Sequence, residues 1–112
     1  YASSDFNFNS FYVIMEFQCF KFGRIVFLNM ELYIKSGTIV ASNTVYSFNS
    51  KAMPTEVRPK RNTLLQGFCC DSDFGNATQI SVYIDKDTGF IRYSLPTAKS
   101  YIAVQGFWLI DS

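Results

Sequence analysis

The sequence contains no histidine. This absence excludes Ser-His and Cys-His nucleophilic pairs and removes the side chain that most often acts as a general base near neutral pH. Three cysteines occur, Cys19, Cys69 and Cys70, and none has the Cys-x-x-Cys spacing typical of zinc ligands. Their odd number argues against a disulfide framework, so we expect three reduced thiols and no zinc site.

Closely spaced carboxylates are the remaining candidates for catalysis or metal binding. Asp71 and Asp73 form one pair and Asp85 and Asp87 another, but a glycosidase needs two carboxyl groups across a cleft, and aspartate is also common in turns. Residues 71–76 resemble the start of a calcium loop, yet the Gly and Asn are in swapped order and Val82 occupies the twelfth position, where glutamate is required. We therefore expect a non-enzymatic protein with no metal and no cofactor.

The chain also lacks a large excess of positive or negative charge, and it lacks long apolar runs. The net charge is +1 and no apolar run reaches the ~18 residues that span a bilayer. The sequence thus predicts neither nucleic-acid binding nor membrane insertion. Because residues 1–10 are polar and aromatic and the chain does not begin with methionine, we expect them to be a connector from a longer parent chain.

The dominant feature of the 112-residue chain is alternation of apolar and polar residues, with 48% hydrophobic and 18% aromatic content and almost no helical periodicity. The size predicts a single domain over residues 1–112. The pattern predicts an all-β fold, a jelly-roll-like antiparallel β-sandwich of about eight strands. The expected strands cover 11–21, 24–34, 38–41, 44–48, 63–70, 78–85, 90–95 and 100–110.

The two faces of these strands differ in an informative way. Alternation places Phe11, Val13, Met15, Phe17 and Cys19 inward on the first strand, and it gives the later strands inward sets that include Val26, Leu28, Met30, Leu32, Ile34, Ile80, Val82, Ile84, Ile102, Val104, Trp108 and Ile110. Many outward positions are also apolar, namely Tyr12, Ile14, Phe20, Ile25, Phe27, Tyr33, Tyr101, Ala103, Phe107 and Leu109. Either some strands are buried on both faces or this surface is an oligomer interface.

The segment 51–62 interrupts the alternation with two prolines, Pro54 and Pro59, and three nearby cations, Arg58, Lys60 and Arg61. Proline cannot donate to a strand ladder, so the segment is expected to be the long connection between two sheets. Arg58 precedes a proline and should be extended, with its guanidinium on loop carbonyls or on Glu56. A basic nucleic-acid patch is the alternative reading of the three cations.

Four features in this order resemble receptor-binding proteins of phage tail fibres and baseplates, specifically their C-terminal (head) domain. They are Phe22-Gly23-Arg24-Ile25-Val26, then Met53-Pro54-Thr55-Glu56-Val57-Arg58-Pro59, then Asp87-Thr88-Gly89, and finally the aromatic strand Phe107 to Ser112. The family loop commonly has a Gly and an aromatic residue before Arg-Pro, where this chain has Thr55, Glu56 and Val57. The resemblance implies a jelly-roll-like homotrimer in a virion or prophage tail, made in the bacterial cytoplasm and joined to other tail proteins.

Within this framework the loop 71–77 is the candidate ligand site. Asp71, Asp73 and Asn76 can hydrogen-bond sugar hydroxyls, and Phe74 offers a ring for stacking. A solvent-exposed turn explains the same residues equally well. We expect host attachment through a cell-surface saccharide, bound by loops at one end of the domain rather than by a sheet face. The alternative is a purely structural trimerisation or virion-assembly domain.

Overall fold

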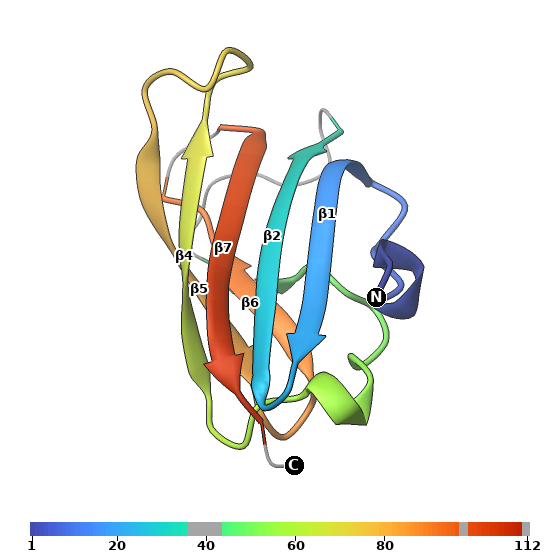
Figure 1. Cartoon of the computed structure of the whole chain (residues 1–112). Helices are drawn as coiled ribbons and strands as arrows, with labels where there is room; N and C mark the ends of the chain where they lie inside the picture. Colours follow the sequence, from blue (N-terminus) through green and yellow to red (C-terminus); the bar gives the residue numbers. More distant parts are fainter. Residues whose placement is uncertain (36–43, 97–98, 111–112) are drawn as a thin grey trace.

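The computed structural model describes residues 1–35, 44–96 and 99–110. They form one seven-stranded antiparallel sheet in the order β1-β2-β7-β4-β5-β6-β3 (Figure 1). Two 3₁₀ turns, η1 (Ser3–Asp5) and η2 (Thr55–Val57), are the only helical segments in this described part of the chain. The strands are β1 (Tyr12–Phe22), β2 (Ile25–Ile34), β3 (Tyr46–Ser47), β4 (Thr63–Cys70), β5 (Thr78–Asp85), β6 (Phe90–Ser94) and β7 (Tyr101–Leu109).

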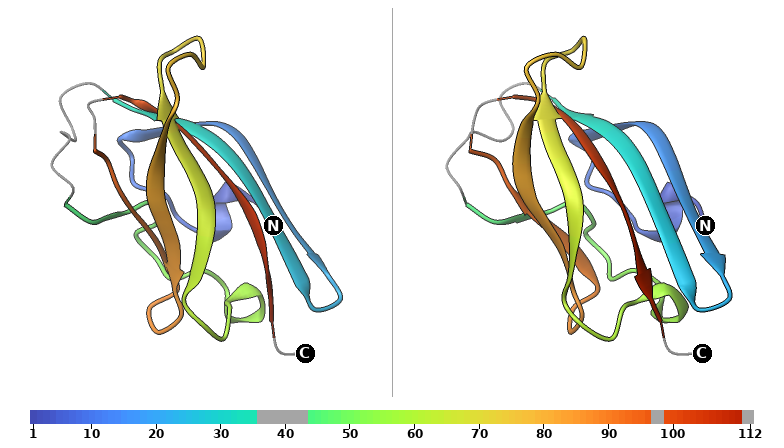
Figure 2. Two further views of the ribbon diagram at one scale, coloured as in Figure 1. Left: turned by 90° about the vertical axis from the view of Figure 1, so that its left-hand side faces the viewer. Right: turned by 60° about the vertical axis from the view of Figure 1, so that its left-hand side comes forward.

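The all-β prediction is confirmed, but the two-sheet sandwich is wrong. The last strand, β7, pairs with both β2 and β4 and so joins the first hairpin to the β4-β5-β6 meander without a break. One sheet curls into a half-barrel instead (Figure 2). The curl brings β1 toward β6, where the hydroxyls of Tyr12 and Tyr93 lie 2.6 Å apart. The expected strand at 38–41 lies outside the described residues.

The concave face of the sheet holds the core. The predicted inward residues of β2 are all buried, from Val26 to Ile34 at alternate positions. The same holds for Ile80, Val82 and Ile84 on β5 and for Ile102, Val104 and Trp108 on β7. Strict alternation thus identified the buried face wherever the strand is regular.

The face assignment of β1 is wrong in its first half. Tyr12 is buried, whereas Met15 is 40% exposed, the reverse of the expectation. A bulge is the cause: Ile14 pairs with Leu32 and Glu16 with Glu31, so Met15 has no partner on β2. The extra residue changes the phase of the alternation. Tyr12 and Ile14 therefore face the core, and they do not belong to the outward apolar residues.

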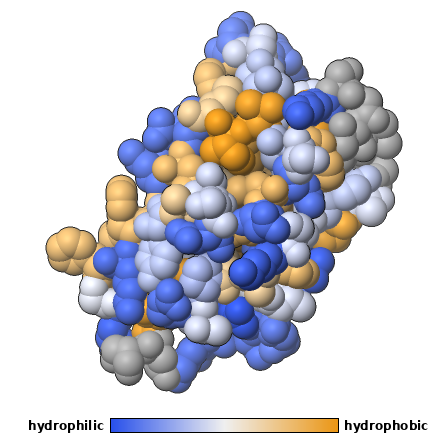
Figure 3. All heavy atoms as spheres, turned by 90° about the vertical axis from the view of Figure 1, so that its right-hand side faces the viewer, coloured by the Kyte–Doolittle hydropathy of each residue, from blue (hydrophilic) through white to orange (hydrophobic). Residues whose placement is uncertain are grey.

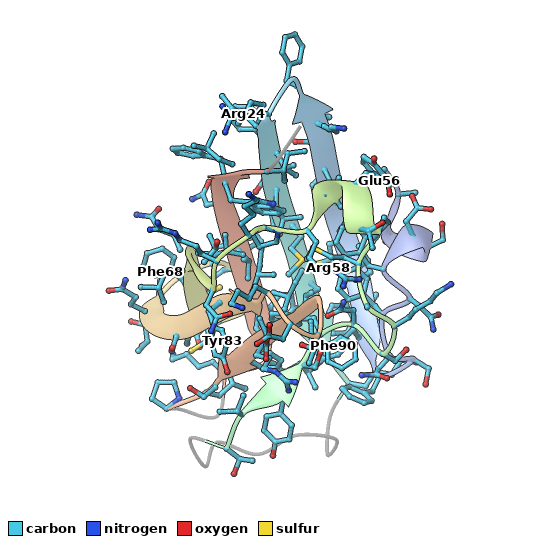
Figure 4. The ribbon with its side chains drawn as sticks, turned by 90° about the horizontal axis from the view of Figure 1, so that it is seen from below. Arg24, Glu56, Arg58, Phe68, Tyr83 and Phe90 are labelled. Carbon is cyan, nitrogen blue, oxygen red and sulfur yellow. The ribbon has the colours of Figure 1, made fainter. Side chains whose placement is uncertain are left out.

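Residues 51–62 cover the core and do not bridge two sheets. Met53 and Val57 are fully buried, and the indole Nε1 of Trp108 donates a 2.7 Å hydrogen bond to the carbonyl of Val57. Arg58 is extended, as predicted, and its Nη2 donates to the carbonyl of Met53 at 3.0 Å. Glu56 points elsewhere and accepts from the Tyr1 hydroxyl (Figure 4). Residues 51–62 therefore form a lid over the open side of the curl.

Residues 1–10, expected as a connector, pack against the domain. Phe6 is fully buried, and its ring lies 5.3 Å from that of Phe17 in an edge contact. Phe8 forms an isolated bridge with Asn49, next to the lid. This segment fills the space between β1 and the chain that follows β3, on a side of the molecule where hydrophobic and hydrophilic residues are mixed (Figure 3).

Candidate functional site

The predicted site residues Asp71, Asp73, Phe74 and Asn76 come together on the loop between β4 and β5, which projects from the top of the sheet in Figure 1. Asp71 accepts hydrogen bonds from Asn76 Nδ2 at 2.7 Å and from Lys99 Nζ at 2.9 Å. These two bonds lower the pKa of the Asp71 carboxyl. Asp73 Oδ1 accepts from the backbone N–H of Gly75 at 2.9 Å.

The backbone of this loop explains much of its composition. Phe74 and Asn76 both have positive φ, 65° and 52°, and the Asp and Asn side chains hold the turn by local hydrogen bonds. Phe74 is 51% exposed and places its ring edge-on to Tyr101, 6.4 Å between centroids. A ligand here would have to share or replace bonds that the loop already makes.

A second feature lies on the outer, convex face of the sheet. The strand register aligns five uncharged polar residues from five neighbouring strands, since Gln18 pairs with Asn29, Asn29 with Gln105, Gln105 with Gln66, and Gln66 with Ser81. We call these five residues the amide row. They line a wide, open groove on this face. All four glutamines of the chain, Gln18, Gln66, Gln79 and Gln105, contribute to its lining.

A parallel apolar row borders the amide row. Phe20 pairs with Phe27, and Phe27 pairs with Phe107, with those two rings 6.0 Å apart. Leu64 continues the row on β4 and pairs with Tyr83 on β5. Phe20, Leu64 and Phe107 are more than half exposed, and Leu64 reaches 80%. We call Phe20, Phe27, Phe107, Leu64 and Tyr83 the apolar row.

On the other side of the amide row, Phe68 of β4 is half-buried and pairs with Gln79 (Figure 4). Phenylalanine and leucine side chains are exposed to water at the centre of this face. Exposed apolar patches of this extent mark binding surfaces. The groove therefore combines hydrogen-bonding amides in its floor with apolar side chains along its border.

The side chains that line the groove are uncharged. None of the residues that line it, all within the described part of the chain, carries a charge or titrates near neutral pH. The described residues also contain no group of His, Cys, Asp or Glu side chains that could hold a metal ion. The arrangement can bind a neutral molecule through hydrogen bonds and ring contacts.

Sequence reasoning located the pieces of this site without assembling them. Gln18, Phe20, Phe27 and Phe107 were correctly expected to point outward, as were Gln79 and Ser81. What the sequence did not show was that β7 lies between β2 and β4 and brings Gln105 into line with Asn29 and Gln66. The clearest signal in the sequence was Gln105, a single amide within the otherwise apolar outward set of 101–109.

Comparison with protein-family models and with curated proteins found no match for this chain. No helix in the described segments is long and apolar enough to cross a membrane.

Proposed function

We propose that this chain is a non-enzymatic host-attachment module of a phage or prophage tail fibre or baseplate, and that it binds a cell-surface saccharide in the outer-face groove. The observation that supports this function most strongly is the amide row beside exposed aromatic rings. A primary amide both donates and accepts hydrogen bonds, as a sugar hydroxyl does, and aromatic rings contact the apolar faces of sugar rings.

The groove is a better place for the ligand than the loop 71–77. In the loop, Asp71 is bonded to Asn76 and Lys99, and Asp73 accepts from the backbone N–H of Gly75. No hydrogen bond ties the side chains of Gln66 and Gln105 to other residues in the described part of the chain. Exposed amides exchange bonds with water for bonds with hydroxyls, so each contact contributes little affinity. A homotrimer would raise the affinity for a cell surface by multivalency.

A glycan array tests the proposal directly. The parent domain should bind one class of glycan, and the double variant Gln66→Ala/Gln105→Ala should lose that signal with an unchanged melting temperature. The matched control is Asp73→Ala/Phe74→Ala, which removes the loop candidates and should keep the signal. An array without any specific binding, or release of sugar from the bound glycan, would refute a non-enzymatic saccharide-binding function.

The second candidate is a structural trimerisation or virion-assembly domain that contacts other tail proteins. The observation in its favour is an apolar corner next to the β1–β2 turn, formed by Phe22, which is 80% exposed, and Leu109, which is 59% exposed. Ile25 pairs with both residues and connects them across the sheet. Side chains of this size and exposure are typical of protein interfaces.

A further inference from the structure

We infer, on the basis of the proposed function, that the groove takes a linear, uncharged glycan that lies across the strands along the amide row. The reason is a repeated unit in the protein. On each of the five strands, the polar side chain of the amide row is followed or preceded, two residues away on the same face, by one large side chain of the apolar row. The pairs are Gln18/Phe20, Asn29/Phe27, Gln105/Phe107, Gln66/Leu64 and Ser81/Tyr83.

A repeated polar and apolar pair fits a ligand with the same repeat. Each ring of a glycan chain has hydroxyl groups at its edge and C–H groups on its face, so one ring can meet one polar side chain, an amide or the Ser81 hydroxyl, and one side chain of the apolar row. Neighbouring strands lie about 4.8 Å apart, and the five positions therefore span about 19 Å. This length accommodates a short run of sugar rings, about one for each strand.

The direction of the ligand follows from the rows. The apolar side chains border the amide row over its whole length, so a chain-like ligand in contact with both must run across the strands. An extended peptide would instead gain its affinity from backbone hydrogen bonds at a free strand edge. The centre of this face offers side chains only, because the backbones of β2, β7, β4 and β5 are paired on both sides.

The lack of charge defines the ligand class. Acidic sugars are usually held by arginine or lysine through charge-assisted hydrogen bonds. The lining residues within the described chain include no Arg or Lys and no Asp or Glu. A carboxylate or phosphate placed in the groove would lose hydration without gaining an ion pair, so a neutral glycan is favoured over an acidic one.

The test is calorimetric titration of the whole chain with neutral linear gluco-, manno- and galacto-oligosaccharides of increasing length, and with oligogalacturonates as the acidic counterpart. For the neutral series that binds, affinity should rise with each added ring and level off at about five rings, when the row is filled. Oligogalacturonates should bind at least tenfold more weakly. Gln66→Ala/Gln105→Ala should reduce the affinity for the longest chain about tenfold, from two lost hydrogen bonds.

Four outcomes would overturn this inference. A monosaccharide that binds as tightly as the longest chain would exclude the extended site. Preferential binding of oligogalacturonate would exclude the neutral class. Binding that is lost in Asp73→Ala/Phe74→Ala and kept in the glutamine variant would place the ligand on the loop. That result would support saccharide binding as the function and refute the groove as the binding site. Absence of binding to every saccharide contradicts the proposed function as well. Circular dichroism and the melting temperature establish that each variant is folded.

Discussion

At the scale of single residues, the lid over the core depends on a few specific contacts. Trp108 is buried and anchors the lid through its hydrogen bond to Val57. Gly89 lies beneath the same lid with a φ of 71°, and a Cβ there would come within 2.7 Å of Arg58 Nε. A side chain at Gly89 would thus be strained by the backbone and would also displace the guanidinium.

Replacement of Trp108 by alanine should lower the free energy of unfolding by about 3–5 kcal/mol, because it leaves a large cavity and an unpaired carbonyl at Val57. Trp108→Phe keeps most of the volume and should cost less. Urea denaturation measures both values. A native fluorescence emission maximum typical of tryptophan in water would contradict the buried placement.

The pH dependence of stability offers a second prediction at this scale. Burial raises the pKa of the Cys19 thiol from 9.0 to about 11, so the folded protein keeps a proton that the unfolded chain loses. The stabilisation is complete below pH 9 and is lost as the pH rises from 9 to 11. Denaturation midpoints across this range should therefore fall less steeply for Cys19→Ala than for the parent. Equal slopes would show that Cys19 ionises normally in the fold.

At the scale of elements, regular alternation was enough to predict most strands, and their buried faces follow from it. The segments 63–70 and 78–85 coincide with β4 and β5. Three things could not be deduced: the bulge at Met15, which leaves no trace in the composition; the curl of one sheet; and the position of β7 between β2 and β4. These depend on contacts between distant segments, which the local pattern does not encode. The amide row was missed for the same reason.

The bulge leads to a contrast between two substitutions. Met15→Ser should change the free energy of unfolding by no more than about 0.5 kcal/mol, because the side chain lies outside the core. Tyr12→Ser should cost about 3 kcal/mol or more, since Tyr12 packs against Phe48 and Tyr93 in the core. Chemical denaturation compares the two. If Met15→Ser were the more damaging change, the phase shift in β1 would be wrong.

At the scale of the whole molecule, the curled sheet has a concave face filled by core and lid and a convex face that nothing in the described chain covers. The amide row and apolar row lie across the middle of the convex face, and Phe22 and Leu109 form a corner beside them. Phe22 also lines the groove, so the two proposed roles, ligand binding and self-association, would use adjoining parts of one face that share this residue.

Light scattering tests the self-association. We expect a homotrimer at high micromolar concentration, and a monomer for Phe22→Ser/Leu109→Ser, because burial of these two side chains would be lost in the variant. The double variant should remain folded as a single chain, and its melting temperature should change little, because both residues are exposed. A parent chain that scatters as a monomer would count against the trimer.

The central claim is that the amide row binds a neutral saccharide, and NMR titration tests it most directly. The side-chain NH₂ signals of Gln18, Gln66, Gln79 and Gln105 report on the groove, and that of Asn76 reports on the loop 71–77. On addition of the neutral oligosaccharide that binds best, we predict concerted shifts of the glutamine signals with the Asn76 signal unchanged. Shifts confined to Asn76 and its neighbours, with the four glutamines unmoved, would contradict the account.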